Sequence, residues 1–339
     1  MIKITDSPPV AKWSEFVQNH PHGNIFQSPE MAQVYRHTKN YEPISLAAID
    51  EETYSILGIL QGVILKENGG IIGSLSSRSI IQGGPLYKDN EKGMEALKLL
   101  IEYYNEISRK KSLYTQIRNM FDTSAVSSTL EMAGFEYSEH LNFIINLNRP
   151  VENIWQDLHK PRKKGIKRAQ ENGLKAIVLE DKSNIKIFYQ ILEETYKKVG
   201  LPVADISLLE SAFEFLVPKN MAKFYLVQYE DSFIGARVVL NYKNTVFDWY
   251  AGALIKYLPL YVNEFIVWHI LEDSSKNKYF TFDFGGAGNP NEEYGVREFK
   301  RRFGGEMVNY GRWKKEHSPV KLRVAEMGYK VYRNLINTR

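Results

Sequence analysis

The two halves of this 339-residue chain show the same order of expected strands and helices. Residues 43–69 read as two apolar strands joined by an acidic turn, and a helix, a strand, a helix and a closing strand follow. Residues 221–242 again read as strand, acidic turn and strand, followed by a third strand, a helix and a strand. Repetition of one order of elements indicates two copies of one structural unit. The same order predicts a mixed central sheet in each copy.

We therefore expect an α/β fold of the α+β type, with two tandem domains that each have a mixed central sheet flanked by helices. The first domain is expected over residues 1–147 and the second over residues 148–317, with the join in the NLNRPV stretch at 146–151. Residues 318–339 are expected to form a C-terminal helix, because apolar residues recur there at helical spacing.

The composition and the motifs exclude several kinds of catalytic and metal-binding chemistry. The chain has no cysteine, which excludes thiol catalysis, disulfides and cysteine-bound zinc. The seven histidines are scattered and match no metal-binding spacing, so no metal is expected. Dinucleotide-binding, P-loop and serine-elbow motifs are also absent from the sequence. With no apolar run long enough for a membrane span and no apolar core of a secretory signal at the N-terminus, we expect a cytoplasmic protein.

The densest positive charge lies between Lys160 and Arg168, where six of nine residues are basic and none is acidic. On a helix, Lys160, Lys164 and Lys167 share one face with Lys163, and Arg162 and Arg168 belong to the same run. Such a cluster repels itself unless an anion is near, so it favours a phosphate-rich ligand. The alternative is an ordinary solvated helix face.

A second basic stretch, GVREFKRRFGG at 295–305, follows a glycine-rich loop. It carries Arg297, Lys300, Arg301 and Arg302 between aromatic residues. Phe299 and Phe303 fall on one helical stripe and are expected in the core, which draws Lys300 toward a partly apolar rim. An ammonium there can stabilise a phosphate or a developing oxyanion. Alternatively, Lys300 extends its ammonium to solvent along an apolar surface.

Asp283, in the FDFGG stretch, is also ambiguous. It either ends its strand by accepting hydrogen bonds from loop amides, which we favour, or acts as a base. The DFG letters resemble a kinase motif, but the other kinase motifs are absent.

These stretches together resemble the Fem family of non-ribosomal peptidyltransferases, which add amino acids to peptidoglycan precursors. The resemblance rests on RKKGIKRAQENG, on DFGG followed by GVREFKRRFGG, on FQSPEM near the N-terminus and on EDSFIGARVVL, and it covers residues 10–315. The family is built from two tandem domains of the Gcn5-related N-acetyltransferase (GNAT) type, so the resemblance implies two GNAT-like domains.

The resemblance also implies roles for particular residues. Phe299 and Lys300 match a Phe-Lys pair whose lysine helps to bind the aminoacyl-tRNA end and stabilises the transition state. Tyr250 matches a tyrosine of the acceptor cleft. The candidate catalytic residues are thus Lys300, Phe299 and Asp283, and the candidate substrate-binding residues are Tyr250, Arg36, Arg297, Arg301, Lys160, Arg162, Lys164 and Arg168.

The sequence departs from the family at the positions that bind muropeptide. Met31 and Tyr35, with Arg36 beside them, stand where the family has a tryptophan and a phosphate-binding lysine. Ile206 and Glu210 stand where muropeptide-binding members have an arginine and a tyrosine. The resemblance therefore does not carry the muropeptide contacts to this chain.

We expect an acyltransferase that moves an aminoacyl or acyl group to an amine of a cell-envelope precursor or peptide-like acceptor. Aminoacyl-tRNA or acyl-CoA would be the donor substrate, with no separate cofactor. One alternative is an acyl-CoA N-acyltransferase acting on a sugar or polysaccharide precursor, although the usual pyrophosphate-binding motif of such enzymes is missing. A further alternative is a non-catalytic protein that binds RNA or phosphate. Oligomeric state and peripheral membrane contact are left open.

Overall fold

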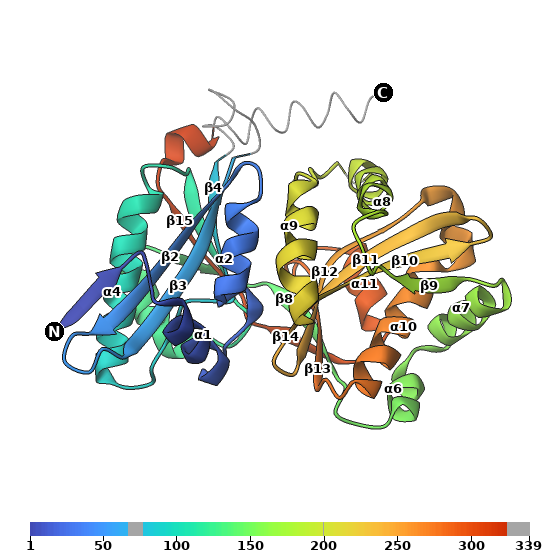
Figure 1. The fold of residues 1–339 in the computed structure, drawn as a ribbon, viewed down its shortest axis with the longest axis horizontal. Coiled ribbons are helices and arrows are strands. Elements are labelled where there is room, and N and C mark those ends of the chain that lie inside the picture. Colours follow the sequence, from blue (N-terminus) through green and yellow to red (C-terminus); the bar gives the residue numbers. More distant parts are fainter. Residues whose placement is uncertain (67–76, 199, 324–339) are drawn as a thin grey trace. The chain divides into compact units, whose positions relative to one another are not determined.

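The computed structural model describes residues 1–66, 77–198 and 200–323. The chain forms two compact units (Figure 1). Unit 1 consists of residues Met1–Glu139 together with Tyr310–Arg339, and unit 2 consists of His140–Asn309. Of the expected C-terminal helix, residues 319–323 are helical, and residues 324–339 lie outside the described part of the chain.

Unit 1 is built on a mixed sheet in which, among the described strands, only β4 and β6 pair in parallel. In spatial order its strands are β1 (Ile2–Thr5), β2 (Tyr41–Asp50), β3 (Ile56–Leu65), β4 (Arg78–Gln82), β6 (Tyr114–Arg118), β15 (Arg312–Glu316) and β7 (Glu136–Ser138), with β5 (Leu86–Tyr87) also on β3. The helices of unit 1 are α1 (Val10–Asn19), α2 (Pro29–Arg36), α4 (Glu91–Ser108) and α5 (Ser127–Met132).

Local sequence explains these helices. Ser28 caps α2 by accepting a hydrogen bond from the Met31 amide at 3.2 Å, and Pro29 holds the first helical position. In α4, Leu97, Leu100 and Tyr104 recur at helical spacing and are buried against the sheet.

Unit 2 repeats the arrangement, and β12 and β13 are the parallel pair among its described strands. Its strands, in spatial order, are β9 (Lys175–Val178), β10 (Ala222–Tyr229), β11 (Ser232–Tyr242), β12 (Thr245–Ala253), β13 (Thr281–Gly286), β8 (Leu141–Asn146) and β14 (Glu306–Asn309). Its helices are α6 (Val151–Asp157), α7 (Lys160–Glu171), α8 (Ile185–Lys198), α9 (Ser207–Leu216), α10 (Val262–Lys276) and α11 (Gly295–Arg301). The predicted duplication of one mixed α/β unit is confirmed.

The two units exchange one strand each, which the sequence patterns do not predict. β7 pairs in the sheet of unit 1, but β8, which begins three residues after β7 ends, pairs with β13 and β14 in unit 2. Conversely, β15 follows β14 in the chain and inserts between β6 and β7 in unit 1. The expected boundaries at 147/148 and 317/318 therefore differ from the observed ones at 139/140 and 309/310. Alternating apolar residues predict a buried strand, but they do not indicate which of two similar sheets it enters.

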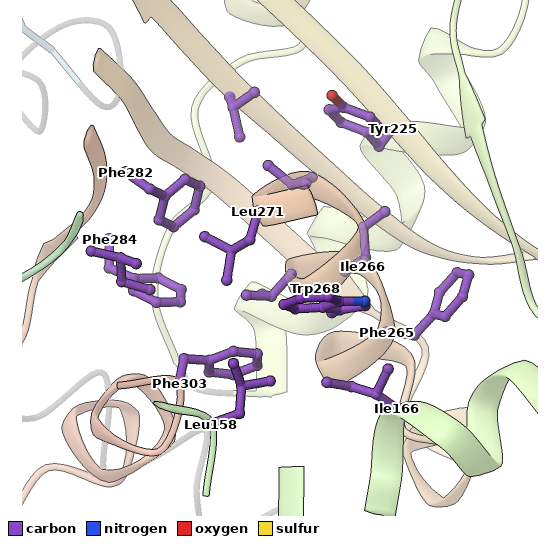
Figure 2. Close-up of a cluster of buried hydrophobic side chains, with 14 of the residues drawn as sticks. Leu158, Ile166, Tyr225, Phe265, Ile266, Trp268, Leu271, Phe282, Phe284 and Phe303 are labelled. Carbon is purple, nitrogen blue, oxygen red and sulfur yellow. The ribbon is translucent and has the colours of Figure 1, made fainter. Parts of the chain in front are cut away.

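The core of unit 2 lies between its sheet and α10 (Figure 2). Figure 2 labels the following members of this cluster: Leu158, Ile166, Tyr225, Phe265, Ile266, Trp268, Leu271, Phe282, Phe284 and Phe303. Phe303 is fully buried, and its ring lies 5.6 Å from that of Phe284. Burial of a side chain of this size contributes about 1.5–3 kcal/mol, so Phe303 anchors the short helix α11 that precedes it.

Candidate active site

The two parallel strands of unit 2 separate after a short paired stretch. The paired stretch joins Thr245–Phe247 of β12 to Thr281–Asp283 of β13. Residues 284–286 of β13 are not paired with β12. β12 also carries a bulge, because Asp248 and Tyr250 lie opposite consecutive residues of β11 and Trp249 is the extra residue. Beyond Asp283, the main-chain groups on this side of β13 must therefore bond to something other than a strand.

Lys300 of α11 supplies that partner. Its Nζ donates hydrogen bonds to the carbonyl oxygens of Phe284 at 2.5 Å, Gly286 at 2.8 Å and Gly285 at 3.3 Å. The side chain is only 8% exposed, so Lys300 does not extend its ammonium to solvent. An ammonium group has three protons, so each proton has one of these carbonyl oxygens as its acceptor. The hydrogen bond to Gly285 is the longest of the three.

Asp283 lies beside Lys300 and is 3% exposed. Its Oδ1 accepts a hydrogen bond from the Gly285 amide at 2.7 Å. The expected bond to a backbone amide is present, but Asp283 does not end its strand, because both residues lie within β13. Burial raises the pKa of the Asp283 carboxyl to about 6, although the Gly285 amide and the Lys300 charge oppose that shift. Burial likewise lowers the pKa of the Lys300 ammonium to about 8.

A second buried pair completes the charged cluster. Arg237 of β11 donates to Asp248 of β12 through Nε at 2.8 Å and through Nη2 at 2.5 Å. Both side chains are nearly inaccessible, at 5% and 7% exposure. Asp248 raises the pKa of Lys300, whereas Arg237 lowers it, so all four groups act on one another. Buried titratable groups with shifted pKa values concentrate at functional sites, and we take this cluster as the candidate active site.

The second pair was not among the residues predicted from the sequence, although the sequence contains a signal for it. Arg237 stands within SFIGARVVLNY and Asp248 within TVFDWYAGA, so each is a single charge in an apolar strand. Charged residues are almost never fully buried unless they are paired. Two such strands that are neighbours in the sheet therefore indicate a buried ion pair.

The other cations of α11 bind groups of this chain. Arg297 donates through Nε to the carbonyl of Ala287 at 2.9 Å, and its guanidinium also reaches the carbonyls of Asn289 and Pro290. Arg301 pairs with Glu298 at 2.7 Å and is half exposed. Lys300 thus binds the carbonyl oxygens at the end of β13, and Arg297 binds those of the loop that follows. Direct substrate binding by Arg297 or Arg301 thus remains only a prediction from the sequence.

The cations of the basic helix α7 are of two kinds, those that turn into the protein and those that are exposed to solvent. Arg162 turns inward, where it pairs with Glu264 and stacks its guanidinium over the Phe299 ring at 4.2 Å. Phe299 is therefore partly buried, and its contact with Arg162 packs α7 against α11. Lys160 and Lys164 are exposed together with Lys167, and no ion pair involves them in the described part of the chain. These three lysines form the free lysine stripe of α7.

The first turn of α10 lies beside α7. Arg168 donates to the hydroxyl of Tyr261 at 3.3 Å, and Gly165 allows the Tyr261 ring to approach, because a Cβ there would lie 2.7 Å from it. Tyr261 precedes α10 and offers no side-chain cap. Uncapped amides at a helix N-terminus attract anions. The positive charge of Arg168 on α7 and the positive end of the α10 dipole therefore lie close together in unit 2.

Tyr250 belongs to an aromatic group that lines β12 and α8. Its ring lies 5.0 Å from that of Trp249 and 6.1 Å from that of Tyr196, a residue that was not predicted from the sequence. Burial raises the pKa of the Tyr196 hydroxyl, and the nearby Tyr250 adds to the effect. Arg36, in contrast, is exposed at the end of α2 in unit 1, whereas all the other candidate residues lie in unit 2.

Two further observations concern broad classes of site. Among the described residues, no group of histidines and carboxylates is arranged to hold a metal ion. Within the same residues, no helix has the length and apolar character needed to cross a membrane.

Comparison with known proteins agrees with this fold. Residues 160–301 match the family model of the acetyltransferase (GNAT) domain. The crystal structure of FemX matches with a TM-score of 0.71 and 14% identity, over 95% of this chain and 100% of that chain. L-PGS from Bacillus licheniformis matches with a TM-score of 0.59 and 13% identity, over 99% and 100% of the two chains. A tandem GNAT protein from the clavulanic acid biosynthesis pathway matches with a TM-score of 0.58 and 10% identity, over 94% and 99%. No curated protein matches the sequence significantly.

The chain thus has the tandem GNAT fold, and residues 160–301 of unit 2 match the GNAT acetyltransferase domain. Its overall fold is Fem-like, as the sequence resemblance implied.

Proposed function

We propose that unit 2 transfers an aminoacyl or acyl group from an activated ester or thioester to the amine of an acceptor. The observation that supports this most directly is the position of Lys300. It is a buried ammonium beside a buried carboxyl group, at the point where the two parallel strands of a GNAT-type sheet separate. The fold supports acyl transfer in general, and the donor and acceptor belong to the proposal.

In the proposed reaction, the amine nitrogen attacks the carbonyl carbon and forms the new C–N bond. Electrons move to the carbonyl oxygen, and they return when the C–O or C–S bond to the leaving group breaks. Lys300 stabilises the oxyanion electrostatically, because a reacting oxygen can replace the Gly285 carbonyl, its most distant acceptor at 3.3 Å. Asp283 receives the amine proton, directly or through a water.

The donor's phosphates are proposed to bind between the free lysine stripe of α7 and the first turn of α10. The stripe offers positive charge that no acidic side chain of the described residues neutralises, and the helix terminus offers amides. An aminoacyl-tRNA, with a phosphate at every nucleotide, fits such an extended stripe well. Charged tRNA and coenzyme A both occur in the cytoplasm, where we propose that the protein acts.

The buried pair predicts a bell-shaped dependence of the transfer rate on pH. Below about pH 6, Asp283 takes up a proton and can no longer accept one from the amine, so the rate falls. Above about pH 8, Lys300 loses its proton and with it the positive charge that stabilises the oxyanion, so the rate falls again. Initial rates measured over the range that spans both pKa values test this. A rate that keeps rising well above the Lys300 pKa would contradict the role given to Lys300.

Neutralising the stripe is expected to weaken donor binding in a salt-dependent way. For the double variant Lys164→Gln/Lys167→Gln, the slope of log affinity for tRNA against log salt should decrease by about two, because each lysine that binds a phosphate contributes about one to that slope. The matched control is Lys186→Gln/Lys276→Gln, which removes two exposed lysines from α8 and α10 of the same unit. Equal slopes for the double variant and the control would remove α7 from the donor site.

The second candidate is an acyl-CoA N-acyltransferase that acts on a sugar or polysaccharide precursor. The match of residues 160–301 to the acetyltransferase domain favours it. Calorimetry separates the two candidates, with coenzyme A in one titration and a pool of aminoacyl-tRNA in the other. Binding of tRNA without turnover of any donor in the presence of varied amines would instead indicate a non-catalytic RNA-binding protein.

A further inference from the structure

Strand β13 contains an extra residue at the candidate site. Asp283 lies opposite Ile144 of β8 and Gly286 lies opposite Asn142, so three steps along β13 match two steps along β8. Such a β-bulge changes the direction of the strand locally. Gly285 lies within the bulge and has a φ of +67°, in the left-handed region that residues with a side chain rarely adopt. The bulge therefore depends on a glycine at this position.

The bulge changes where the carbonyl groups of β13 point. In a regular strand, the carbonyls of successive residues point to opposite edges, so three in a row cannot face one atom. Here the carbonyls of Phe284, Gly285 and Gly286 all accept hydrogen bonds from Lys300 Nζ. The residue in the left-handed conformation is the middle one of the three. Together the three carbonyls match the three N–H donors of a primary ammonium group.

The surroundings of Gly285 show that backbone conformation, and not crowding, requires glycine there. A Cβ at this position would have Phe247 Cζ as its nearest neighbour, at 3.4 Å, which is an ordinary contact. The Gly285 amide already has its partner in Asp283 Oδ1, at 2.7 Å. Alanine would thus fit into the available space but would oppose the left-handed conformation.

We propose that Gly285 is a positioning residue, which holds three consecutive carbonyls around one point and so forms a backbone site for a primary ammonium group. This site sets the position of the Lys300 charge. Because the site belongs to the backbone, it should bind a free primary ammonium ion once the side chain of Lys300 is removed. The site does not depend on the proposed function, whereas the use of its charge in acyl transfer rests on that function.

Binding of a free amine tests the site without any substrate. Lys300→Ala removes Cγ, Cδ, Cε and Nζ, which are the heavy atoms of propylammonium. At about ten times its Kd, propylammonium should raise the Tm of Lys300→Ala by about 3–6 °C and leave that of the wild type unchanged. Tetramethylammonium has the same charge but no N–H donor, so it should not raise the Tm. A shift no larger for propylammonium than for tetramethylammonium would overturn the proposal.

A second variant tests Gly285 in a chain that keeps Lys300. In Gly285→Ala the hydrogen bonds to Lys300 should weaken, so its Nζ hydrogens should exchange with water about tenfold faster, as followed by nitrogen-15 NMR below the Lys300 pKa. Gly173→Ala is the matched control, because Gly173 has a φ of +79° and a Cβ there would meet nothing within 4 Å. It bears the same kind of backbone strain away from the site. Equal exchange in the two variants would refute the role of Gly285.

Transfer activity separates the site from the proposed function. Propylammonium should restore transfer in Lys300→Ala by about tenfold or more over the variant alone, because the charge returns to its place. In the double variant Lys300→Ala/Gly285→Ala, it should neither raise the Tm nor restore transfer. A rise in Tm without restored transfer would support the site and would remove the Lys300 charge from the proposed reaction.

Discussion

Replacement of Lys300 by methionine is expected to lower the rate of acyl transfer by about two to three orders of magnitude, the usual cost of losing one group that stabilises an oxyanion. Methionine keeps much of the length of the side chain and removes its charge. The substrate complex should still form, because donor phosphates are assigned to α7, so the loss should appear in kcat more than in KM. Initial rates at saturating donor, measured near neutral pH, test this expectation.

The buried position of Lys300 adds a stability cost. Methionine leaves the carbonyls of Phe284 and Gly286 without their donor, and each buried unsatisfied group costs about 1–3 kcal/mol. Rates must therefore be measured at a temperature where the variant is folded. Lys276→Met is the control, since Lys276 is an exposed residue of α10 whose ion pair with Glu272 lies on the surface. Full activity in folded Lys300→Met would refute the catalytic assignment.

Replacement of Trp313 by alanine is expected to destabilise unit 1 by about 3–5 kcal/mol, the usual cost of removing a buried tryptophan. Trp313 follows unit 2 in the chain, yet strand exchange places it in the core of unit 1 at 2% exposure. Its indole donates to Thr123 at 3.0 Å, and its ring meets that of Tyr137 edge to face at 5.1 Å.

Hydrogen exchange shows which unit Trp313→Ala destabilises. In Trp313→Ala, amide protection should fall in β6 and β7 of unit 1 and remain in β10 and β11 of unit 2. The neighbouring Lys314→Ala is the control, because Lys314 is partly exposed and its ion pair with Glu316 lies on the surface. Protection that falls first in unit 2 would mean that β15 belongs to that unit and that the strands are not exchanged.

Features set by local pattern could be predicted from the sequence. The duplicated order of strands and helices, the cap at Ser28 and the helical core positions of α4 all follow from periodicity and capping rules. The position of Phe303 in the core was also expected, and with it the nearness of Lys300 to apolar side chains. Each of these depends on residues a few positions apart in the chain.

Features set by distant partners could not be predicted. The acceptors of Lys300 and Arg297 are backbone carbonyls, which have no signature in the sequence. The inward turn of Arg162 depends on Glu264, a residue far away in the chain. Strand exchange depends on which of two similar sheets gains more from β8, a choice between two long-range pairings with similar apolar patterns.

Titration of Lys300 itself shows whether it is a buried cation next to the reacting acyl group. Nitrogen-15 NMR of protein labelled at lysine Nζ gives the pKa of each ammonium, and Lys300→Met identifies the resonance. We expect a pKa of about 8 for Lys300 in the free protein. A non-hydrolysable donor whose acyl group is replaced by an anionic mimic of the tetrahedral intermediate should raise it, because negative charge then lies beside the ammonium. An ordinary lysine pKa that does not respond to such a ligand would show that Lys300 is not a buried cation beside the reacting group.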